Sequence, residues 1–365
     1  MTEQMKDVSS DAEKLSGGGT EKTGSATKIV HSGAAAVSAN EHAELHRIIW
    51  RIANDLRGSV DGWDFKQLGM MFYRFISENL SEYNNKYEHD AGDLDFDYAK
   101  LHNSDIDQDL VHDIIEERGF FLFPSQLFEN VYAQARTDEN LNETFEKVFQ
   151  AVETSTKNTQ SERNFAGLFD DFDVNSKKLG SSVQDRNKTL YKLMSAVAEM
   201  KLETSYQQST NDTFGDAYEY LMGIYAANAG KSGGEYYTPQ EVSELLARIA
   251  TDGKTQVGRV YDPACGSGSL LLKFAKLLGA ENVKEFLGQE SNPTTYNLCR
   301  INMLLHNIPF DKFDIAHGDT LIAPQHRHLE PFEAIVSNPP YSTKWEGDSN
   351  PLLINDDRYA PAGVL

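Results

Sequence analysis

Four groups of residues in the second half of the chain combine side chains that can bind a nucleoside and a planar amino group. The first group is a glycine turn, Asp262-Pro263-Ala264-Cys265-Gly266-Ser267-Gly268-Ser269. Its glycines let the backbone approach a ligand closely, and a helix that follows offers free N–H groups. Leu271 stands where a dinucleotide fingerprint needs its third glycine, and no Gly-Lys-Ser/Thr follows, so a P-loop is excluded. By itself the motif also fits an ordinary tight turn.

Two carboxylates follow the next two predicted strands. Glu290 comes 28 residues after Asp262 and can accept hydrogen bonds from two ribose hydroxyls. Alone, it also fits an acid placed ahead of a helix that begins at Pro293. Asp319, in His317-Gly318-Asp319, can accept a hydrogen bond from an adenine amino group, or it is a plain loop aspartate.

The most specific group is Ser337-Asn338-Pro339-Pro340-Tyr341, whose Asn338 comes 76 residues after Asp262. Two prolines fix the backbone and remove two donors, which leaves carbonyls free to accept. The Asn338 amide oxygen and the Pro339 carbonyl can therefore both accept from one NH2 group. Tyr341 offers a flat face on which a base can stack.

A fourth group lies upstream and ends in an amphipathic stretch. Its residues can line the two ends of a nucleoside cofactor: Glu235, Tyr236, Tyr237, Thr238, Pro239 and Gln240. The same residues also predict a capped helix start, with Thr238 at N-cap, Pro239 at N1 and Glu241 at N3.

The elements around these groups alternate between strands and helices. Strands are predicted at 260–262, 286–290, 313–316 and 332–336, and helices at 270–278 and 293–306. This alternation predicts a parallel, doubly wound sheet with right-handed crossovers. Ligands of such sheets lie at the carboxyl ends of the strands, where the glycine turn, the two carboxylates and the Asn338 group fall.

The first half of the chain has a different character. Residues 1–41 are rich in Ser, Gly, Ala and Thr, which predicts a disordered tail. A helical domain is predicted for residues 42–205, and a second domain for residues 206–365. Two apolar stripes with helical spacing support the first prediction: Leu45, Ile48, Ile49, Ile52 and Leu56, then Leu68, Met71, Phe72, Phe75 and Ile76. Residues 81–120 carry many acids and predict a solvated face, with docking of a basic partner as the alternative.

Composition limits the partners and the compartment. The 365 residues include 34 basic and 56 acidic ones, for a net charge of −22. Phosphate binding rests on Lys and Arg, so a partner must supply much of the positive surface if the protein works on DNA. Cys265 and Cys299 are the only cysteines, which favours a reducing, cytoplasmic location over a disulfide framework. The sequence has no CxxC or HExxH, no signal-peptide pattern and no long apolar run, so we expect no zinc site, secretion signal or membrane helix.

Taken together, these motifs resemble the S-adenosylmethionine-dependent amino-methyltransferases of DNA, and more narrowly the methylation (M) subunits of type I restriction-modification systems. The order Gly-Glu-Tyr-Tyr-Thr-Pro, Asp-Pro-Ala-Cys-Gly-Ser-Gly, Asn-Pro-Pro-Tyr is typical of that family. Two N-terminal segments also resemble it: Ile49-Trp50-Arg51-Ile52-Ala53-Asn54-Asp55-Leu56-Arg57-Gly58 and Gly119-Phe120-Phe121-Leu122-Phe123-Pro124-Ser125. The resemblance covers residues 42–365.

The resemblance implies a helical N-terminal domain followed by a Rossmann-like methyltransferase domain that methylates the N6 amino group of adenine in DNA. It implies S-adenosylmethionine as cofactor, bound by residues 235–240, by Asp262 with Gly266, Ser267, Gly268 and Ser269, by Glu290 and, at the adenine, by Asp319. It implies that Asn338, Pro339, Pro340 and Tyr341 hold the target base. The implied partners are a specificity subunit that reads DNA, a second copy of the chain and a motor-nuclease restriction subunit.

Some alternatives stay open at this stage. Only 24 residues follow Tyr341, fewer than the remaining strands of the family's sheet need, so we expect the domain to be incomplete at its C-terminus. That would also fit a non-catalytic assembly subunit. A protein-glutamine methyltransferase can share Asn-Pro-Pro-Tyr, because glutamine also presents a planar NH2 group. Physics alone does not separate adenine N6 from cytosine N4.

Overall fold

A computed structural model describes residues 63–200, 202, 213–228 and 238–340. All of them belong to one compact unit, Leu45–Leu365. The predicted tail and the first predicted apolar stripe lie outside the described residues. So do Glu235, Tyr236, Tyr237 and Tyr341 of the predicted site.

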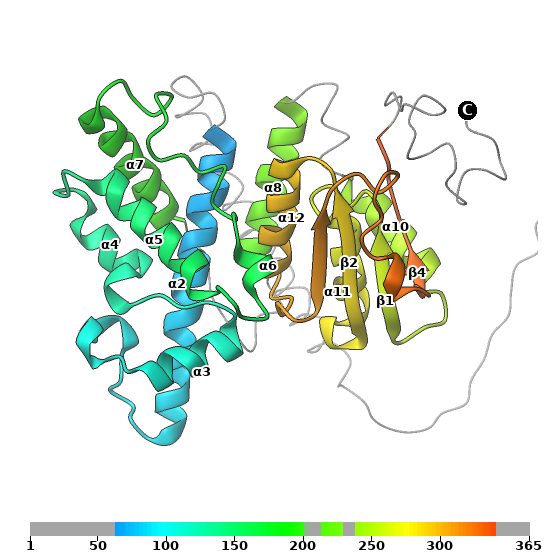
Figure 1. Ribbon diagram of the computed structural model, residues 1–365, viewed down its shortest axis with the longest axis horizontal. Coiled ribbons are helices and arrows are strands. Elements are labelled where there is room, and N and C mark those ends of the chain that lie inside the picture. The colour runs from blue at the N-terminus through cyan, green and yellow to red at the C-terminus, as the bar shows by residue number, and fades with distance from the viewer. Residues whose placement is uncertain (1–62, 201, 203–212, 229–237, 341–365) are drawn as a thin grey trace, which may run out of the picture. The chain divides into compact units, whose positions relative to one another are not determined.

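The first part of the described chain is helical, as predicted for residues 42–205, and α8, which packs with these helices, lies beyond that predicted range (Figure 1). Short 3-10 turns join its helices, and polar or glycine caps set several of their ends. Asp107 caps α3 by accepting from the Leu110 N–H at 2.8 Å, and Gly119 ends that helix in the left-handed conformation. The helices are α2 (Trp63–Ala91), α3 (Gln108–Arg118), α4 (Phe128–Ala135), α5 (Leu141–Ser155), α6 (Glu162–Phe165), α7 (Val183–Ala198) and α8 (Thr213–Asn228).

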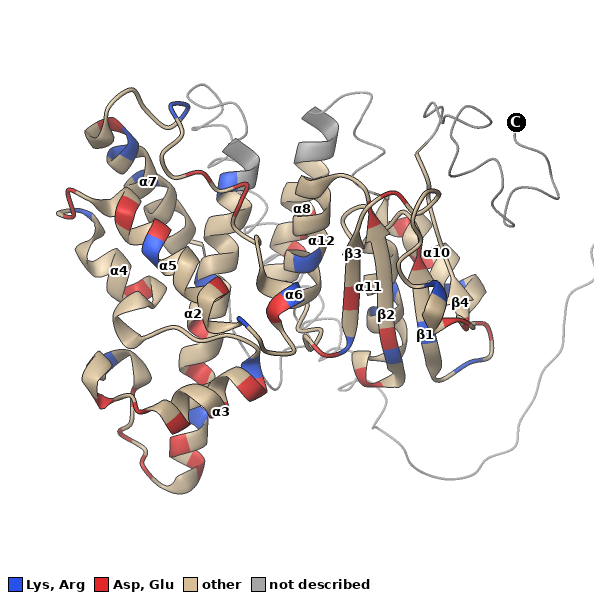
Figure 2. Ribbon diagram, viewed as in Figure 1, with Lys and Arg blue, Asp and Glu red and all other residues tan. Residues whose placement is uncertain are grey.

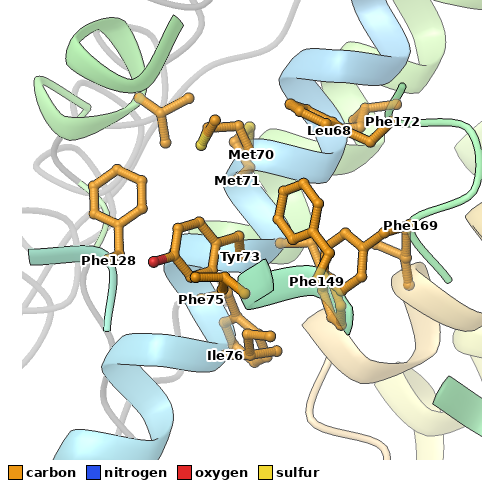
Figure 3. Packing of buried hydrophobic residues seen from close by; sticks show 14 of the residues in the cluster. Leu68, Met70, Met71, Tyr73, Phe75, Ile76, Phe128, Phe149, Phe169 and Phe172 are labelled. Carbon is orange, nitrogen blue, oxygen red and sulfur yellow. The ribbon is translucent and has the colours of Figure 1, made fainter. Parts of the chain in front are cut away.

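The second apolar stripe forms the buried face of α2, which confirms the helical spacing read from the sequence. Each of its five side chains is at most 7% exposed: Leu68, Met71, Phe72, Phe75 and Ile76. Beside them Tyr73 is fully buried, its ring packs 5.5 Å from that of Phe128, and its hydroxyl donates to the Gln126 carbonyl at 2.7 Å (Figure 3). Helices α4 and α5 thus close over α2 around an aromatic core.

The acidic residues of 81–120 lie mainly on the surface of the end of α2, the following loops and α3 (Figure 2). Nine of them are exposed: Asp90, Asp93, Asp95, Asp105, Asp107, Asp109, Asp113, Glu116 and Glu117. This matches the solvated face that the charge run predicts.

The second part of the described chain contains a parallel sheet with strand order β3-β2-β1-β4. After β3 the chain returns to the free side of β1 and forms β4 there, and all three strand pairs are parallel, as predicted. Right-handed crossovers from β1 to β2 and from β2 to β3 place α11 and α12 on the same face. The elements are α10 (Gln240–Ala250), β1 (Val257–Asp262), α11 (Ser269–Leu278), β2 (Val283–Glu290), α12 (Pro293–Leu305), β3 (Phe313–His317) and β4 (Ala334–Ile335).

Strand β4 is shorter than the predicted 332–336. Its ladder with β1 pairs only Ala334 and Ile335, with Val260 and Tyr261 respectively. The N–H groups of Glu333 and Val336 still donate to the β1 carbonyls of Arg259 and Tyr261, at 2.9 and 3.0 Å. Before them, Pro331 has no N–H to donate, and the Phe332 ring stacks on that of Tyr261 at a centroid distance of 4.5 Å.

Helix α12 contributes to two hydrophobic cores. Leu298, Ile301 and Leu305 pack with the helical part of the chain, and Cys299 and Met303 pack with the sheet. No helix among the described residues has the length and apolar character needed to cross a membrane.

Candidate active site

The carboxyl ends of β1 and β2 bring the predicted glycine turn and the predicted acid together. In the parallel register Asp262 pairs with Gly288, two residues before Glu290. The backbone N–H of Cys265 donates to the Gln289 carbonyl at 3.0 Å, which joins the loop after β1 to the end of β2. The Gly266 N–H donates to Glu290 Oε2 at 3.0 Å. Two motifs predicted separately therefore form one structure.

Glycine is needed twice in the turn. Gly266 and Gly268 have φ angles of 54° and 84°, in the left-handed region. A Cβ added at Gly268 would lie 2.8 Å from the Cys299 sulfur, closer than real Cβ contacts. The side chains of Ser267 and Ser269 are buried, and their hydroxyl oxygens lie 3.0 Å apart at the start of α11. The backbone therefore passes close under α12 with no room for a larger residue.

Glu290 is held at both carboxylate oxygens. Oε2 accepts from Gly266, and Oε1 accepts from the Asn292 N–H at 2.8 Å. Asn292 is the N-cap of α12. Glu290 therefore supports the start of that helix, which is the alternative to a ribose-binding role that its position ahead of Pro293 suggests. Each oxygen keeps a second lone pair, so acceptance from ribose hydroxyls is compatible with these contacts.

Asp262 is a fully buried carboxyl at the end of β1. Its Oδ1 accepts from the Ala264 N–H at 3.0 Å. Burial raises the pKa of Asp262 to about 7, and the charge of Glu290 acts in the same direction. A hydrogen bond with the Ser337 side chain lowers the pKa and so opposes the effect of burial. A buried carboxyl beside a glycine turn is chemically compatible with a cationic amino group such as that of S-adenosylmethionine.

Asp319 lies at the same edge of the sheet but points outward. Its side chain is exposed, and Oδ1 accepts from the Leu321 N–H at 2.8 Å. The loop that carries it is fixed from inside by Gln289, whose Nε2 donates to the carbonyls of Gly318 and Ala323 at 3.1 and 2.9 Å. Sequence reasoning missed Gln289; its place between Gly288 and Glu290 at the end of a buried strand was the available signal.

Asn338 and the upstream motif meet across 100 residues of sequence. Asn338 is half-buried, and its Nδ2 donates to Thr238 Oγ1 at 3.4 Å, while Pro339 and Pro340 are exposed. Helix α10 starts at Gln240 with Pro239 as its N-cap, so the predicted N-cap at Thr238 is wrong by one residue. The Thr238 hydroxyl faces Asn338 instead of capping the helix. Both side-chain polar atoms of Gln240 are buried and have no hydrogen-bond partner among the described residues.

An open depression of about 600 Å³ lies at the other end of the sheet. It is lined by the first two residues of β1 and by Gln256, Glu281, Asn282, Lys284, Lys312 and Glu333. It lies at the amino ends of the strands, away from the predicted site residues. Among the described residues, no cluster of three or more His, Cys, Asp or Glu side chains is arranged to hold a metal ion.

Comparison with known proteins agrees with this fold and these motifs. The family model for N-6 DNA methylases matches residues 209–365, and that for the HsdM N-terminal domain matches residues 45–197. The solved type I restriction-modification methyltransferase subunit from Streptococcus thermophilus superposes with a TM-score of 0.73 and 30% identity, over 89% of this chain and 68% of that one. The chain therefore belongs to the family of methyltransferase subunits of type I restriction-modification systems.

Two curated relatives extend the similarity. The type I restriction enzyme MpnII methylase subunit of Mycoplasma pneumoniae is 46% identical over 87% of this chain and 61% of its own length. The MjaIX methylase subunit of Methanocaldococcus jannaschii is 24% identical over 86% of this chain and 54% of its own length. The chain thus spans between about half and three fifths of the length of these relatives.

Proposed function

We propose that this chain transfers a methyl group from S-adenosylmethionine to the N6 amino group of adenine in DNA, as the modification subunit of a type I restriction-modification complex. The observation that carries the proposal is the meeting of three motifs at one edge of the sheet. Glu290 contacts the glycine turn at 3.0 Å, Asp262 ends the strand before that turn, and Asn338 follows the neighbouring strand β4.

Within this proposal the residues at the carboxyl ends of β1 and β2 hold the cofactor. Asp262 accepts from its amino group, the turn 266–269 surrounds its methionine part, and Glu290 accepts from its ribose hydroxyls. Thr238 and Gln240 border it from the start of α10, and Asp319 accepts from its adenine. When bound, S-adenosylmethionine supplies an electrophilic methyl group.

The target amine needs activation, because its lone pair is delocalised into the purine ring. We propose that Asn338 Oδ1 and the Pro339 carbonyl accept hydrogen bonds from its two N–H groups and so draw the nitrogen towards tetrahedral geometry. The base must first leave the duplex, which costs a few kcal/mol of unstacking. Stacking on Tyr341, worth about 1–3 kcal/mol, offsets much of that cost.

The proposed partners follow from charge and family. With a net charge of −22, the chain needs a partner that supplies positive surface to DNA. A specificity subunit would fill that role, with a second copy of this chain and a motor-nuclease subunit completing the complex.

The first test is cofactor binding. Calorimetry with S-adenosylmethionine is expected to show one site on the chain, weakened roughly 10- to 100-fold by Glu290→Ala, because hydrogen bonds to a charged group contribute about 1.5–3 kcal/mol. Glu285→Ala is the matched control: it removes a carboxylate from the same strand, one that pairs with Arg259 at 2.6 Å. Equal losses in both variants, or no binding by a folded chain, would contradict the assignment of the cofactor site.

The second test is methyl transfer. In a complex reconstituted with a specificity subunit, labelled methyl groups should appear on adenine N6 in DNA. Asn338→Ala should abolish transfer while leaving cofactor binding within about twofold. Undiminished transfer by this variant would refute the role of Asn338.

A further inference from the structure

Helix α12 holds the candidate site from one of its sides. The backbone N–H of its N-cap residue Asn292 donates to Glu290, which also accepts from Gly266 in the glycine turn. About two turns further on, the Cys299 sulfur lies 3.8 Å from the sulfur of Cys265 in the glycine turn. Asn302 Nδ2 then donates to the Ser267 carbonyl at 2.9 Å. The positions of the acid and of the turn therefore both depend on where α12 lies.

A second side of α12 contacts segment 163–171, which runs from α6 into the loop after it. We call Thr294, Asn297 and Arg300 the α12 contact stripe, since their spacing of three residues places them on one face of the helix. Thr294 Oγ1 donates to Asp171 Oδ1 at 2.8 Å. Asn297 Nδ2 donates to the Gly167 carbonyl at 3.0 Å and to Asp171 Oδ2 at 3.2 Å.

Arg300 makes the most costly of these contacts. Its side chain is 1% exposed, and Nη1 donates to the carbonyls of Arg163 and Ala166, both at 2.9 Å. Its guanidinium lies 4.1 Å from the centroid of the Tyr296 ring. Nη2 donates to Asn297 Oδ1 at 2.5 Å. Burial lowers the pKa of Arg300, while nearby groups that include Glu153 and Asp170 act in the opposite direction, and burying a charge is expensive. The residue therefore ties α12 to the backbone of segment 163–171 at a considerable desolvation cost.

We propose that the α12 contact stripe consists of positioning residues that fix α12 on segment 163–171, so that the helical part of the chain sets the affinity of the cofactor site. This inference rests on the proposed function. A shift of α12 would move Asn292 away from Glu290 and Cys299 away from the glycine turn. Each movement would lower the affinity for the cofactor, although neither Asn292 nor Cys299 contacts it.

Calorimetry with S-adenosylmethionine tests the proposal on the full chain. Asn297→Ala should weaken binding by about five- to tenfold, within the usual range of coupling between sites. Arg300→Lys should also weaken it, because an ammonium can still donate to the carbonyls but loses the hydrogen bond to Asn297 Oδ1 and the planar contact with Tyr296. Asn130→Ala is the matched control, since Asn130 Nδ2 also donates to two carbonyls, of Ala99 and Pro124 at 2.8 Å, far from α12. It should bind as the parent does.

Hydrogen exchange gives a readout that a purely structural role would not move. Coupling is reciprocal, so saturating S-adenosylmethionine should slow amide exchange in segment 163–171, and Asn297→Ala should reduce that protection. Parent-like affinity in both folded stripe variants, or an equal loss in Asn130→Ala, would overturn the inference while leaving the proposed function intact. Absence of binding by the parent chain would instead overturn the proposed function and this inference together.

Discussion

Replacing Gly268 by alanine should destabilise the fold by about 2–5 kcal/mol. The residue has a φ of 84°, and a left-handed conformation costs a side-chain-bearing residue about 1–2 kcal/mol. The new Cβ would also lie 2.8 Å from the sulfur of Cys299, which is fully buried on α12 and has no open space to retreat into. Overpacking of this kind adds about 1–3 kcal/mol.

Gly253→Ala separates the two contributions. Gly253 also has a positive φ, 70°, but a Cβ there would meet nothing within 4 Å. The free energy of unfolding of Gly253→Ala should therefore fall only by the cost of the left-handed conformation, about 1–2 kcal/mol. The excess loss in Gly268→Ala measures the contact with Cys299.

The assay is urea unfolding of the parent, both glycine variants, Cys299→Ala and the double variant Gly268→Ala/Cys299→Ala. In the Cys299→Ala background, Gly268→Ala should lower the free energy of unfolding by at least about 1 kcal/mol less than it does in the parent. This difference is the coupling energy of the double-mutant cycle. Equal losses of stability in Gly268→Ala and Gly253→Ala, or a cycle without coupling, would refute the predicted clash with Cys299.

Two further predictions concern buried groups. Because the folded pKa of Asp262 is raised, its carboxyl stabilises the fold below about pH 4, and that contribution, up to about 4 kcal/mol, is lost as the pH rises through about 7. Asp262→Asn should remove this loss. In urea unfolding, the free energy of unfolding of the variant relative to that of the parent should therefore be higher at pH 8 than at pH 5. The same relative free energy at both pH values would contradict the buried environment of Asp262. Tyr218→Phe should cost about 1 kcal/mol in the same assay, because the fully buried hydroxyl donates to the Leu298 carbonyl at 2.8 Å, and no loss would contradict that bond.

Most of the sheet could be predicted from short-range patterns. The predicted helices 270–278 and 293–306 match α11 and α12 to within one residue, and the predicted strands end where β1 and β2 end. Because parallel strands end at one edge, the proximity of Asp262 to Glu290 followed from the order of the elements alone. The roles assigned to all the site residues, Asp262, Glu290 and Asn338 included, stay predictions.

The polar contacts that hold the site could not be predicted in this way. Arg300 is the one charged residue of α12, and its charge suggests a surface position, yet it is buried against carbonyls 137 and 134 residues away. Backbone acceptors leave no pattern in the sequence. The short β4 and the shifted N-cap of α10 have the same origin, since ring packing of Phe332 and the partner of Thr238 are tertiary contacts that outweighed local preference.

The sharing of α12 between two cores limits how the protein can be divided. A fragment that stops before α12 would leave the helical part without Leu298, Ile301 and Leu305, and a fragment that starts at β1 would expose those same side chains to water. Melting of either part removes buried surface from the other, so heat should unfold both in one cooperative step. A boundary drawn for expression between the helical part and the sheet would therefore yield two insoluble halves in place of two domains.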